Sequence, residues 1–366
     1  MGNFDKQKYD NDYAKQNYDR CIFNVPKGQK AVIEAHWKKK GYKSLNAYVN
    51  ELIRRENLRG VALQCIPKAD DLPVEEDAFA FAAQAKVPVY VFGGLRRELY
   101  RLSEPELSGA LVREAERLMD RGCAGIKMLE GKPQIRKAHP IPDFDRPVWE
   151  PYWSLLEERQ IPVYFHVNDP EEFWDPEKIS KHALESGWLY DETFINNEEQ
   201  YRQVLAVLER HPGLRIVFPH FFFFSGQLDR LRGIMEAFEE IRIDVTPGIE
   251  LYYNLSGQPE AAKKFFGQFQ DRILYGTDSG AGEIVRSQNE ELSLEDALSR
   301  MKLIRDFLET EGTYTLYPDG YYVKEGPRQM QGLGLSPAIL QKIYETNFLE
   351  LIGERKKGPD SLNEKK

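Results

Sequence analysis

Short apolar runs alternate with longer amphipathic stretches along most of the chain. Each apolar run has four to six residues and is rich in β-branched and aromatic side chains, which is typical of a buried strand. The runs lie at residues 61–66, 87–92, 124–129, 161–166, 214–218, 241–245 and 272–275. Between them, apolar positions recur at the spacing of one helix face over residues 104–121, 148–160, 198–210, 228–240 and 261–269.

Strands that alternate with helices predict a parallel sheet with right-handed crossovers. Seven such strands within residues 58–352 predict an α/β fold of the TIM type, a (β/α)8 barrel that lacks its usual first strand. A nucleotide-binding sheet is less consistent with the sequence. No GxGxxG motif opens a helix after the first strand, and no GxxxxGK[ST] motif occurs.

Four of the expected strands lead into a polar side chain with catalytic chemistry. Lys127 lies in AGIKML, His166 ends IPVYFH, His220 follows LRIVFP and Asp278 follows RILYGT. In a barrel the carboxyl ends of all strands meet at one rim, so we expect these side chains to lie close together. Two imidazoles and a carboxylate are a suitable ligand set for zinc or a similar divalent metal, which lowers the pKa of a bound water toward about 7.

The same residues resemble the amidohydrolase superfamily, in its branch of amidohydrolase-related metal-dependent hydrolases and decarboxylases. The resemblance spans about residues 58–352. It rests on GIK, the FH of the fifth strand, the H that closes the sixth, the YGTD of the eighth and the helix ILQKIYETNFLELIG. It implies an enzyme that hydrolyses, or decarboxylates, a small carboxylated or cyclic organic substrate.

The resemblance also assigns roles to single residues. His166 and His220 match histidines that bind metal or polarise the substrate, and Asp278 matches an aspartate that binds metal and shuttles a proton. Lys127 matches a lysine that either bridges metals as a carbamate or contacts the substrate. The catalytic candidates are therefore Asp278, His220 and Lys127, and the metal candidates are His166, His220 and Asp278.

One family feature is missing. The family's first strand ends in His-x-His, and this chain has no His-x-His anywhere. Residues 1–57 follow a different pattern where that strand is expected. Two hypotheses stay open for the barrel: it binds a metal through the three remaining ligands, or it is catalytically impaired. We expect the other four histidines to lie at the surface or to be hydrogen-bonded without a ligand role: His36, His139, His182 and His211.

Charge divides the chain at about the same place. The sequence of 366 residues has a formal net charge of −9, but residues 1–60 hold 13 Lys and Arg against 7 Asp and Glu, a net charge of +6. The remainder therefore carries −15. A basic head on an acidic body predicts two modules with different partners. We expect a disordered arm at residues 1–19, a small module at 20–57, the barrel at 58–352 and a charged tail at 353–366.

The pattern of the basic module predicts one strand, a helix that ends at Gly41 and a second helix that begins at Ser44. It resembles a ribbon-helix-helix DNA-binding domain of the Arc type, on the stretches RCIFNVPKG and SLNAYVNELI. The resemblance implies a homodimer whose paired strands present Arg20, Ile22 and Asn24 to the DNA major groove, with a phosphate at the helix start at Ser44. The alternative is a module that only dimerises. If the module binds DNA, a second hypothesis for the whole chain is a regulator whose barrel senses a ligand.

Two short polar segments follow expected strands of the barrel. Lys132 and Arg136, in an expected loop at residues 131–137, either bind a substrate carboxylate or belong to a solvated loop. Asn168 and Asp169, directly after the His166 strand, either orient a ligand or belong to a surface turn.

Two further segments are unusual in composition. Residues 221–224 are four consecutive phenylalanines, which we do not expect all to face inward. We expect them to line an apolar pocket or a subunit interface, with core packing as the alternative. Residues 311–335 read as a long loop or a hairpin, and such a segment over a barrel rim is often a lid.

The sequence also predicts a location. No apolar run approaches the roughly 20 residues of a membrane helix, and the polar N-terminus contains no export signal. Three widely spaced cysteines, Cys21, Cys65 and Cys123, favour neither a disulfide framework nor a thiolate zinc site. We therefore expect a cytoplasmic protein.

Overall fold

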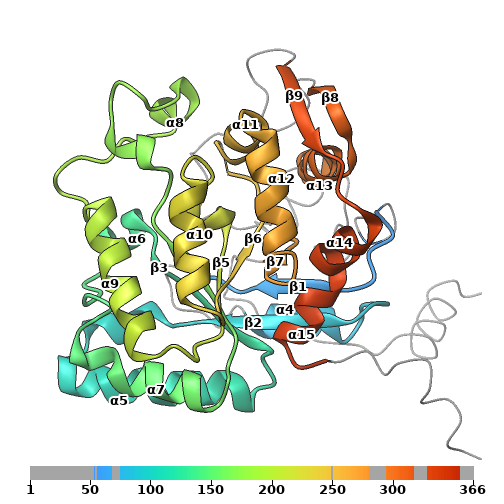
Figure 1. The fold of residues 1–366 in the computed structure, drawn as a ribbon. Helices are drawn as coiled ribbons and strands as arrows, with labels where there is room; N and C mark the ends of the chain where they lie inside the picture. The colour runs from blue at the N-terminus through green and yellow to red at the C-terminus, as the bar shows by residue number, and fades with distance from the viewer. Residues whose placement is uncertain are drawn as a thin grey trace, which may run out of the picture.

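Seven parallel strands form one sheet, and their order in the sheet is their order in the sequence (Figure 1). The computed structural model describes residues 53, 56–67, 75–248, 250–279, 294–316 and 328–354. The strands are β1 (Val61–Gln64), β2 (Val89–Gly94), β3 (Gly125–Gly131), β4 (Val163–Val167), β5 (Ile216–Phe218), β6 (Arg242–Asp244) and β7 (Ile273–Leu274). All seven predicted strands are confirmed, although β1, β4, β5, β6 and β7 are shorter than expected.

Helices cover the outside of the sheet and connect its strands (Figure 1). All five predicted helices are present, and α5 is typical: the Ser103 N–H donates to Glu106 at the helix start, and the apolar face buries Leu107, Leu111 and Leu118. The helices that connect the seven strands are α4 (Glu75–Ala82), η1 (Arg97–Arg101), α5 (Glu104–Asp120), α6 (Pro133–Ala138), η2 (Pro147–Trp149), α7 (Glu150–Glu158), η3 (Glu171–Trp174), α8 (Lys181–Glu185), α9 (Asn197–Arg210), η4 (His220–Phe223), α10 (Leu228–Ala237), α11 (Leu251–Ser256) and α12 (Pro259–Gln268).

The sheet curls around an apolar interior. Phe92 of β2 and Tyr164 of β4 are separated by the whole of β3, yet their ring centroids are only 5.0 Å apart. Alternate strands of a flat sheet lie about 9 to 10 Å apart, so both side chains must point into one concave face. Val217, Leu274 and Leu351 belong to the same buried cluster. This inner layer is typical of a TIM-type barrel.

The sheet order ends at β1 on one side and at β7 on the other. Three C-terminal helical segments, α14 (Pro337–Gln341), η6 (Lys342–Thr346) and α15 (Asn347–Leu351), cover the seam between these two edges. The Asn347 side chain donates to the carbonyl of Ile273 in β7 at 2.7 Å, and Glu345 accepts from Arg59, just before β1, at 3.5 Å. The C-terminal segments therefore bridge the position where a closed barrel has a further strand.

A two-stranded antiparallel hairpin follows α13 (Leu294–Glu309). Its strands are β8 (Glu311–Leu316) and β9 (Arg328–Leu333), and β9 packs against α12 and α13. The segment expected to be a long loop or a hairpin is thus a hairpin. Its role as a lid stays a prediction.

The basic head lies almost entirely outside the described residues. The interpretations that depend on Arg20, Ile22, Asn24 and Ser44, including DNA binding and the homodimer, fall on this undescribed part. The expected disordered arm and the tail beyond Glu354 also lie outside it. None of the helices in the described ranges is long and apolar enough to cross a membrane.

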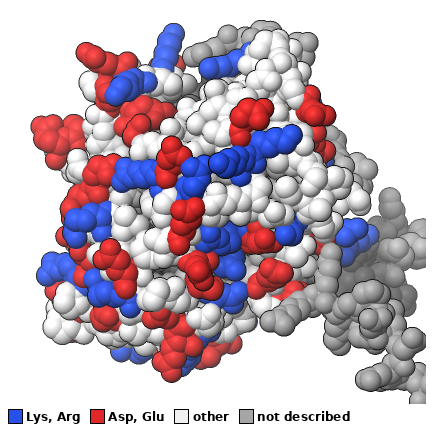
Figure 2. Space-filling view, viewed as in Figure 1, with Lys and Arg blue, Asp and Glu red and all other residues white. Residues whose placement is uncertain are grey.

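Charged side chains of both signs are interspersed on the face shown in Figure 2. Ion pairs between charged side chains of the described residues include Arg230 with Glu198 and Arg202 with Glu199, both at 2.6 Å. Exposed pairs of this kind contribute only about 0 to 1 kcal/mol each. The negative charge of the body is therefore mixed with positive charge on this face.

Candidate active site

The polar side chains expected at the rim come from three neighbouring strands and from the segment after β7. Lys127 lies in β3, His166 in β4, His220 two residues after β5 and Asp278 four residues after β7. Because β3 runs on to Gly131, Lys127 lies within its strand and not at the end. The structure brings Lys127, His166 and His220 within electrostatic reach of one another, and Asp278 within reach of Lys127 and His220.

His166 and His220 face each other in the protein interior. Their ring centroids are 5.2 Å apart with the planes at 73°, and the ring of Phe223 stacks on His220 at 5.1 Å. Burial is the main cause that lowers the pKa of His166 to about 4 and the pKa of His220 to about 3. Both imidazoles are therefore neutral at pH 7, and each has one nitrogen lone pair to offer.

The ring of His166 is held by Asp169. His166 Nε2 lies 3.5 Å from Asp169 Oδ1, and the same carboxylate accepts hydrogen bonds from Lys132 Nζ at 2.7 Å and from the Tyr190 hydroxyl at 2.6 Å. Burial opposes ionisation of Asp169, but Lys132 and His166 outweigh it and hold the pKa of this carboxyl well below its usual range. Asp169 is buried, so a surface turn at this position is wrong.

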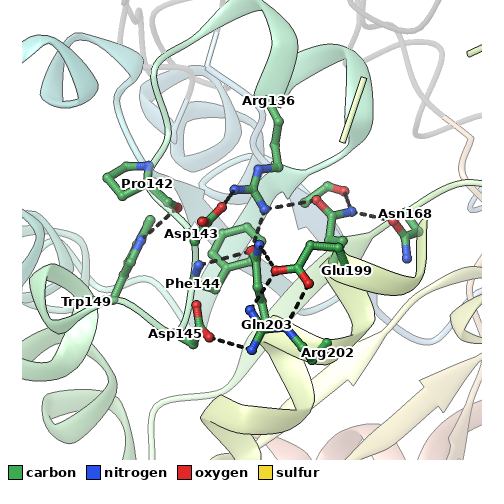
Figure 3. A network of polar contacts seen from close by, with 12 residues as sticks. Arg136, Pro142, Asp143, Phe144, Asp145, Trp149, Asn168, Glu199, Arg202 and Gln203 are labelled. Atoms are coloured by element: carbon green, nitrogen blue, oxygen red, sulfur yellow. Dashed lines mark hydrogen bonds and ion pairs between the residues drawn. The ribbon is translucent and has the colours of Figure 1, made fainter. Parts of the chain in front are cut away.

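Arg136 belongs to a different network (Figure 3). Residues 133–138 form helix α6 and not the expected loop. From this helix, Arg136 donates to Gln203 at 2.8 Å, to Gln200 at 3.2 Å and to Asp143 at 2.7 Å, and its guanidinium lies over the Phe144 ring at 4.7 Å. These contacts join α6 to α9. Arg136 is thus engaged in packing, whereas Lys132 reaches the site through Asp169.

His220 is held through its backbone. Residues 220–223 have φ of 57°, 58°, 55° and 58°, the left-handed region that costs about 1 to 2 kcal/mol per residue for side chains with a Cβ. The His220 N–H donates to Oδ1 of Asp244 at 2.9 Å, and the Tyr201 hydroxyl donates to the carbonyl of Phe222 at 3.0 Å. Asp244 also accepts the N–H of Thr246 at 2.9 Å.

The four phenylalanines after His220 are all buried. Phe222 stacks on Phe218 with ring centroids 3.9 Å apart, and Phe221 packs against α12. The expectation that four consecutive aromatics cannot all face inward is wrong, because the left-handed backbone is neither a regular helix nor a strand. Core packing is confirmed for the run as a whole, and Phe223 also borders both histidines.

Lys127 is a buried cation, only 6% exposed. Burial lowers the pKa of Lys127 to about 8, although Asp244 and Asp278 oppose this shift. Among the described residues, it forms no ion pair with an Asp or Glu side chain within 4.0 Å. At pH 7 the ammonium is mostly protonated, so a positive charge without a close counter-ion lies beside the two imidazoles.

Asp278 lies at the edge of this group. Its side chain is half exposed, and Oδ2 is 3.4 Å from Nη1 of the buried Arg300 in α13. Its φ of 49° is also in the left-handed region. The carboxylate is thus paired with an arginine while it stays accessible to solvent.

A zinc ion needs more donors than this group supplies. His220 Nδ1 is buried and forms no hydrogen bond, which suits a ligand role. His166 Nε2 instead faces the Asp169 carboxylate at 3.5 Å. A structural or catalytic zinc needs at least three protein ligands, however, and no three His, Cys, Asp or Glu side chains gather in that way within the described ranges. The described residues therefore do not complete the predicted site of His166, His220 and Asp278.

Two buried acids near the rim were not among the sequence-based candidates. Asp244 ends β6 and is only 1% exposed. Glu250 lies at the start of α11 with both carboxylate oxygens buried and without a hydrogen bond, and burial, with Glu172 and Asp169 nearby, raises its pKa to about 8. An acidic residue within an apolar run, as in IRIDV, is the signal that indicates Asp244; Glu250 has no such signal.

Residues 101–353, more than two thirds of the chain, match the family described as Amidohydrolase. The chain belongs to the amidohydrolase family. The match covers every candidate in the amidohydrolase-family body, from Lys127 to Asp278. It does not reach residues 20–57, so it gives the Arc-type interpretation no support.

Solved structures resemble this amidohydrolase-family chain at low sequence identity. An uncharacterised TIM-barrel protein from Bordetella bronchiseptica has 12% identity and a TM-score of 0.50, with 89% of this chain and 91% of that chain covered. This similarity supports the TIM-type fold. A 2,6-dihydroxybenzoate decarboxylase from Rhizobium has 17% identity and a TM-score of 0.49, with 90% and 96% covered.

A dihydroxybenzoic acid decarboxylase from Polaromonas sp. JS666, with bound manganese and 2-nitroresorcinol, has 15% identity and a TM-score of 0.47. The alignment covers 90% of each chain. No curated protein matches the chain.

Proposed function

We propose that this chain is an enzyme of the amidohydrolase type that acts on a small carboxylated or cyclic organic substrate at the carboxyl end of its sheet. One observation carries the proposal: two neutral imidazoles, of which His166 is buried and His220 partly buried, face each other beside a buried lysine that has no close counter-ion among the described residues. Buried charges are normally paired, because desolvation is costly. An unpaired cation beside two imidazoles suits an anionic substrate group.

Lys127 binds the anionic group of the substrate in this proposal. A cation within a low-dielectric interior attracts an anion far more strongly than one in water does. The substrate carboxylate, or the oxyanion that forms during the reaction, would act as the counter-ion of Lys127. This role follows one of the two that the family resemblance offers for Lys127.

His220 and His166 polarise the substrate carbonyl, and Asp278 takes the proton from the attacking water and later delivers it to the leaving group. Asp278 suits proton transfer because its carboxylate is accessible, while Arg300 at 3.4 Å fixes its position. Decarboxylation is the related alternative. There the carboxylate leaves as carbon dioxide, and the carbon left with the electron pair takes a proton from the same aspartic acid.

Zinc, or another divalent ion, stays a prediction that rests on the residue types His166, His220 and Asp278. No step above depends on it. The division into a module at residues 20–57 and a barrel at 58–352, and the cytoplasmic location, also stay proposals.

The test uses the purified full chain. Metal content is measured, and esterase, lactonase and decarboxylase activities are assayed with and without a chelator. Asp278→Asn should lower turnover by about 10²- to 10⁴-fold, the range of general acid–base catalysis. Asp229→Asn, at an aspartate whose side chain is 95% exposed, is the matched control and should leave turnover unchanged. Turnover that Asp278→Asn does not affect would contradict the proposal.

A further inference from the structure

The backbone at His220 adopts a conformation that its sequence does not favour. Four consecutive residues, 220–223, are left-handed, and none is glycine. Side chains with a Cβ rarely adopt this conformation, and runs of it are rarer still. Such a backbone persists only where its surroundings over-determine it, and it occurs most often at functional sites.

Two side chains form hydrogen bonds to this run, at different points. Asp244 accepts the N–H of His220 itself, at 2.9 Å. Tyr201 donates to the carbonyl of Phe222, two residues later, at 3.0 Å. Only the Asp244 contact acts on the residue that carries the imidazole. A carboxylate is also a stronger acceptor than a neutral group, so this bond fixes the His220 peptide firmly.

Asp244 is itself held in place. It ends β6, whose pairing with β5 brings Phe218 opposite Ile243. The Thr246 N–H donates to the same carboxylate oxygen at 2.9 Å. Gly276 lies against the other side: a Cβ at that position would be 2.9 Å from Asp244 Oδ2 and 2.2 Å from Thr246 Oγ1. A side chain at position 276 would therefore crowd both Thr246 and the Asp244 carboxylate.

We propose that Asp244 is a positioning residue, which fixes the left-handed backbone at His220 and thereby directs the imidazole toward His166. The proposal rests on the proposed function, in which His220 contacts the substrate. It adds that a residue of β6 determines the orientation of the His220 imidazole, and that β5, the strand before His220, does not. It also explains a glycine at position 276, because a Cβ there would crowd Thr246 and the Asp244 carboxylate.

The experiment separates the hydrogen bond from the charge of Asp244. Asp244→Asn keeps an oxygen that accepts the His220 N–H, whereas Asp244→Ala removes it. Tyr201→Phe is the matched control, because it removes the other side-chain hydrogen bond to the same run. Isotope labelling of histidine alone gives six residues to observe by NMR, so the Cα and ring signals of His220 are assignable by substitution.

We expect Asp244→Ala to shift the Cα and ring signals of His220, and Asp244→Asn and Tyr201→Phe to leave them close to wild type. With a substrate in hand, Asp244→Ala should lower kcat about 100-fold with KM within about 3-fold, and Asp244→Asn should restore most of kcat. Unchanged His220 signals in Asp244→Ala, or equal shifts in Asp244→Asn or Tyr201→Phe, would overturn the proposal.

A second variant covers the case in which Asp244→Ala does not fold. Gly276→Ala leaves Asp244 in the chain but places a Cβ 2.9 Å from its Oδ2 and 2.2 Å from Thr246 Oγ1. We expect this crowding to shift Asp244 together with Thr246, and so to shift the same His220 signals. A Gly276→Ala protein with wild-type His220 signals would overturn the proposal equally. The NMR readout needs no turnover, so failure of the proposed enzyme function is seen separately, as a wild-type protein without activity.

Discussion

His166 and His220 lie side by side, yet the chain holds them in opposite ways. His166 sits within a regular strand, and its ring is held by a carboxylate that is itself paired with Lys132 and Tyr190. His220 follows a short strand, and its backbone is held by Asp244 in an unfavourable conformation. Ion pairing around the ring holds His166, whereas the backbone conformation holds His220. The difference predicts which substitutions lower the stability of the fold and which change the orientation of an imidazole.

Loss of Asp169 should have the largest effect. Asp169→Ala leaves Lys132 and Tyr190 without their shared partner, and removal of one member of a buried ion pair costs about 3 to 5 kcal/mol. Asp244→Ala leaves the backbone N–H groups of His220 and Thr246 without this acceptor, which costs about 1 to 3 kcal/mol. Chemical denaturation of both variants measures the difference. An equal loss in the two would remove the contrast between the histidines.

Glu130 sharpens the comparison, because it is a buried carboxyl with no ion pair within 4.0 Å among the described residues. Burial raises the pKa of Glu130 to about 7, the opposite of the shift at Asp169. A raised pKa means that the folded state binds the proton more tightly, so stability is lost as pH rises from about 4.5 to about 7. The shift corresponds to about 3 kcal/mol.

Glu130→Gln resembles the protonated acid and should remove this loss. The variant should match wild type at pH 4.5 and exceed it by about 2 to 3 kcal/mol above pH 7. Urea denaturation at several pH values gives both curves. A constant difference between the curves at every pH would contradict the raised pKa.

Substitution of two tyrosines should give the smallest effects, and the two variants are closely matched. Tyr190→Phe removes one hydrogen bond to the Asp169 carboxylate, and bonds to charged groups contribute about 1.5 to 3 kcal/mol. Tyr201→Phe removes one bond to a backbone carbonyl, which contributes about 1 kcal/mol. Both tyrosines are buried, so thermal unfolding compares like with like. A larger loss in Tyr201→Phe would reverse the interpretation.

The sequence predicted well the part of this site that lies on or next to regular strands. The runs around Lys127, His166 and His220 are bounded by polar residues and turns, so their strands and the polar residues near their carboxyl ends could be read directly. Pro133 was an unused signal, because proline at the first turn often begins a helix, and it would have indicated α6 in place of a loop. Arg136 then points to α9 and not to a substrate.

The irregular half could not be predicted in the same way. The left-handed turn at 220–223 contains no glycine, which is the local signal for positive φ. It exists because Asp244, in another strand, accepts the His220 N–H, and because the core accommodates all four aromatic rings. These are tertiary contacts between residues distant in sequence, so no local pattern in PHFFFF indicates them.

The seam between β1 and β7 has a consequence for synthesis on the ribosome. The helical segments that cover it, η6 and α15, are made long after both strands. Until they emerge, a nascent chain whose sheet has already formed carries exposed edge groups, which are open to pairing with other chains. Asn347, which donates to the β7 carbonyl, is synthesised late and links the C-terminal segments to this edge. A translation arrest before Asn347 would release an aggregation-prone intermediate.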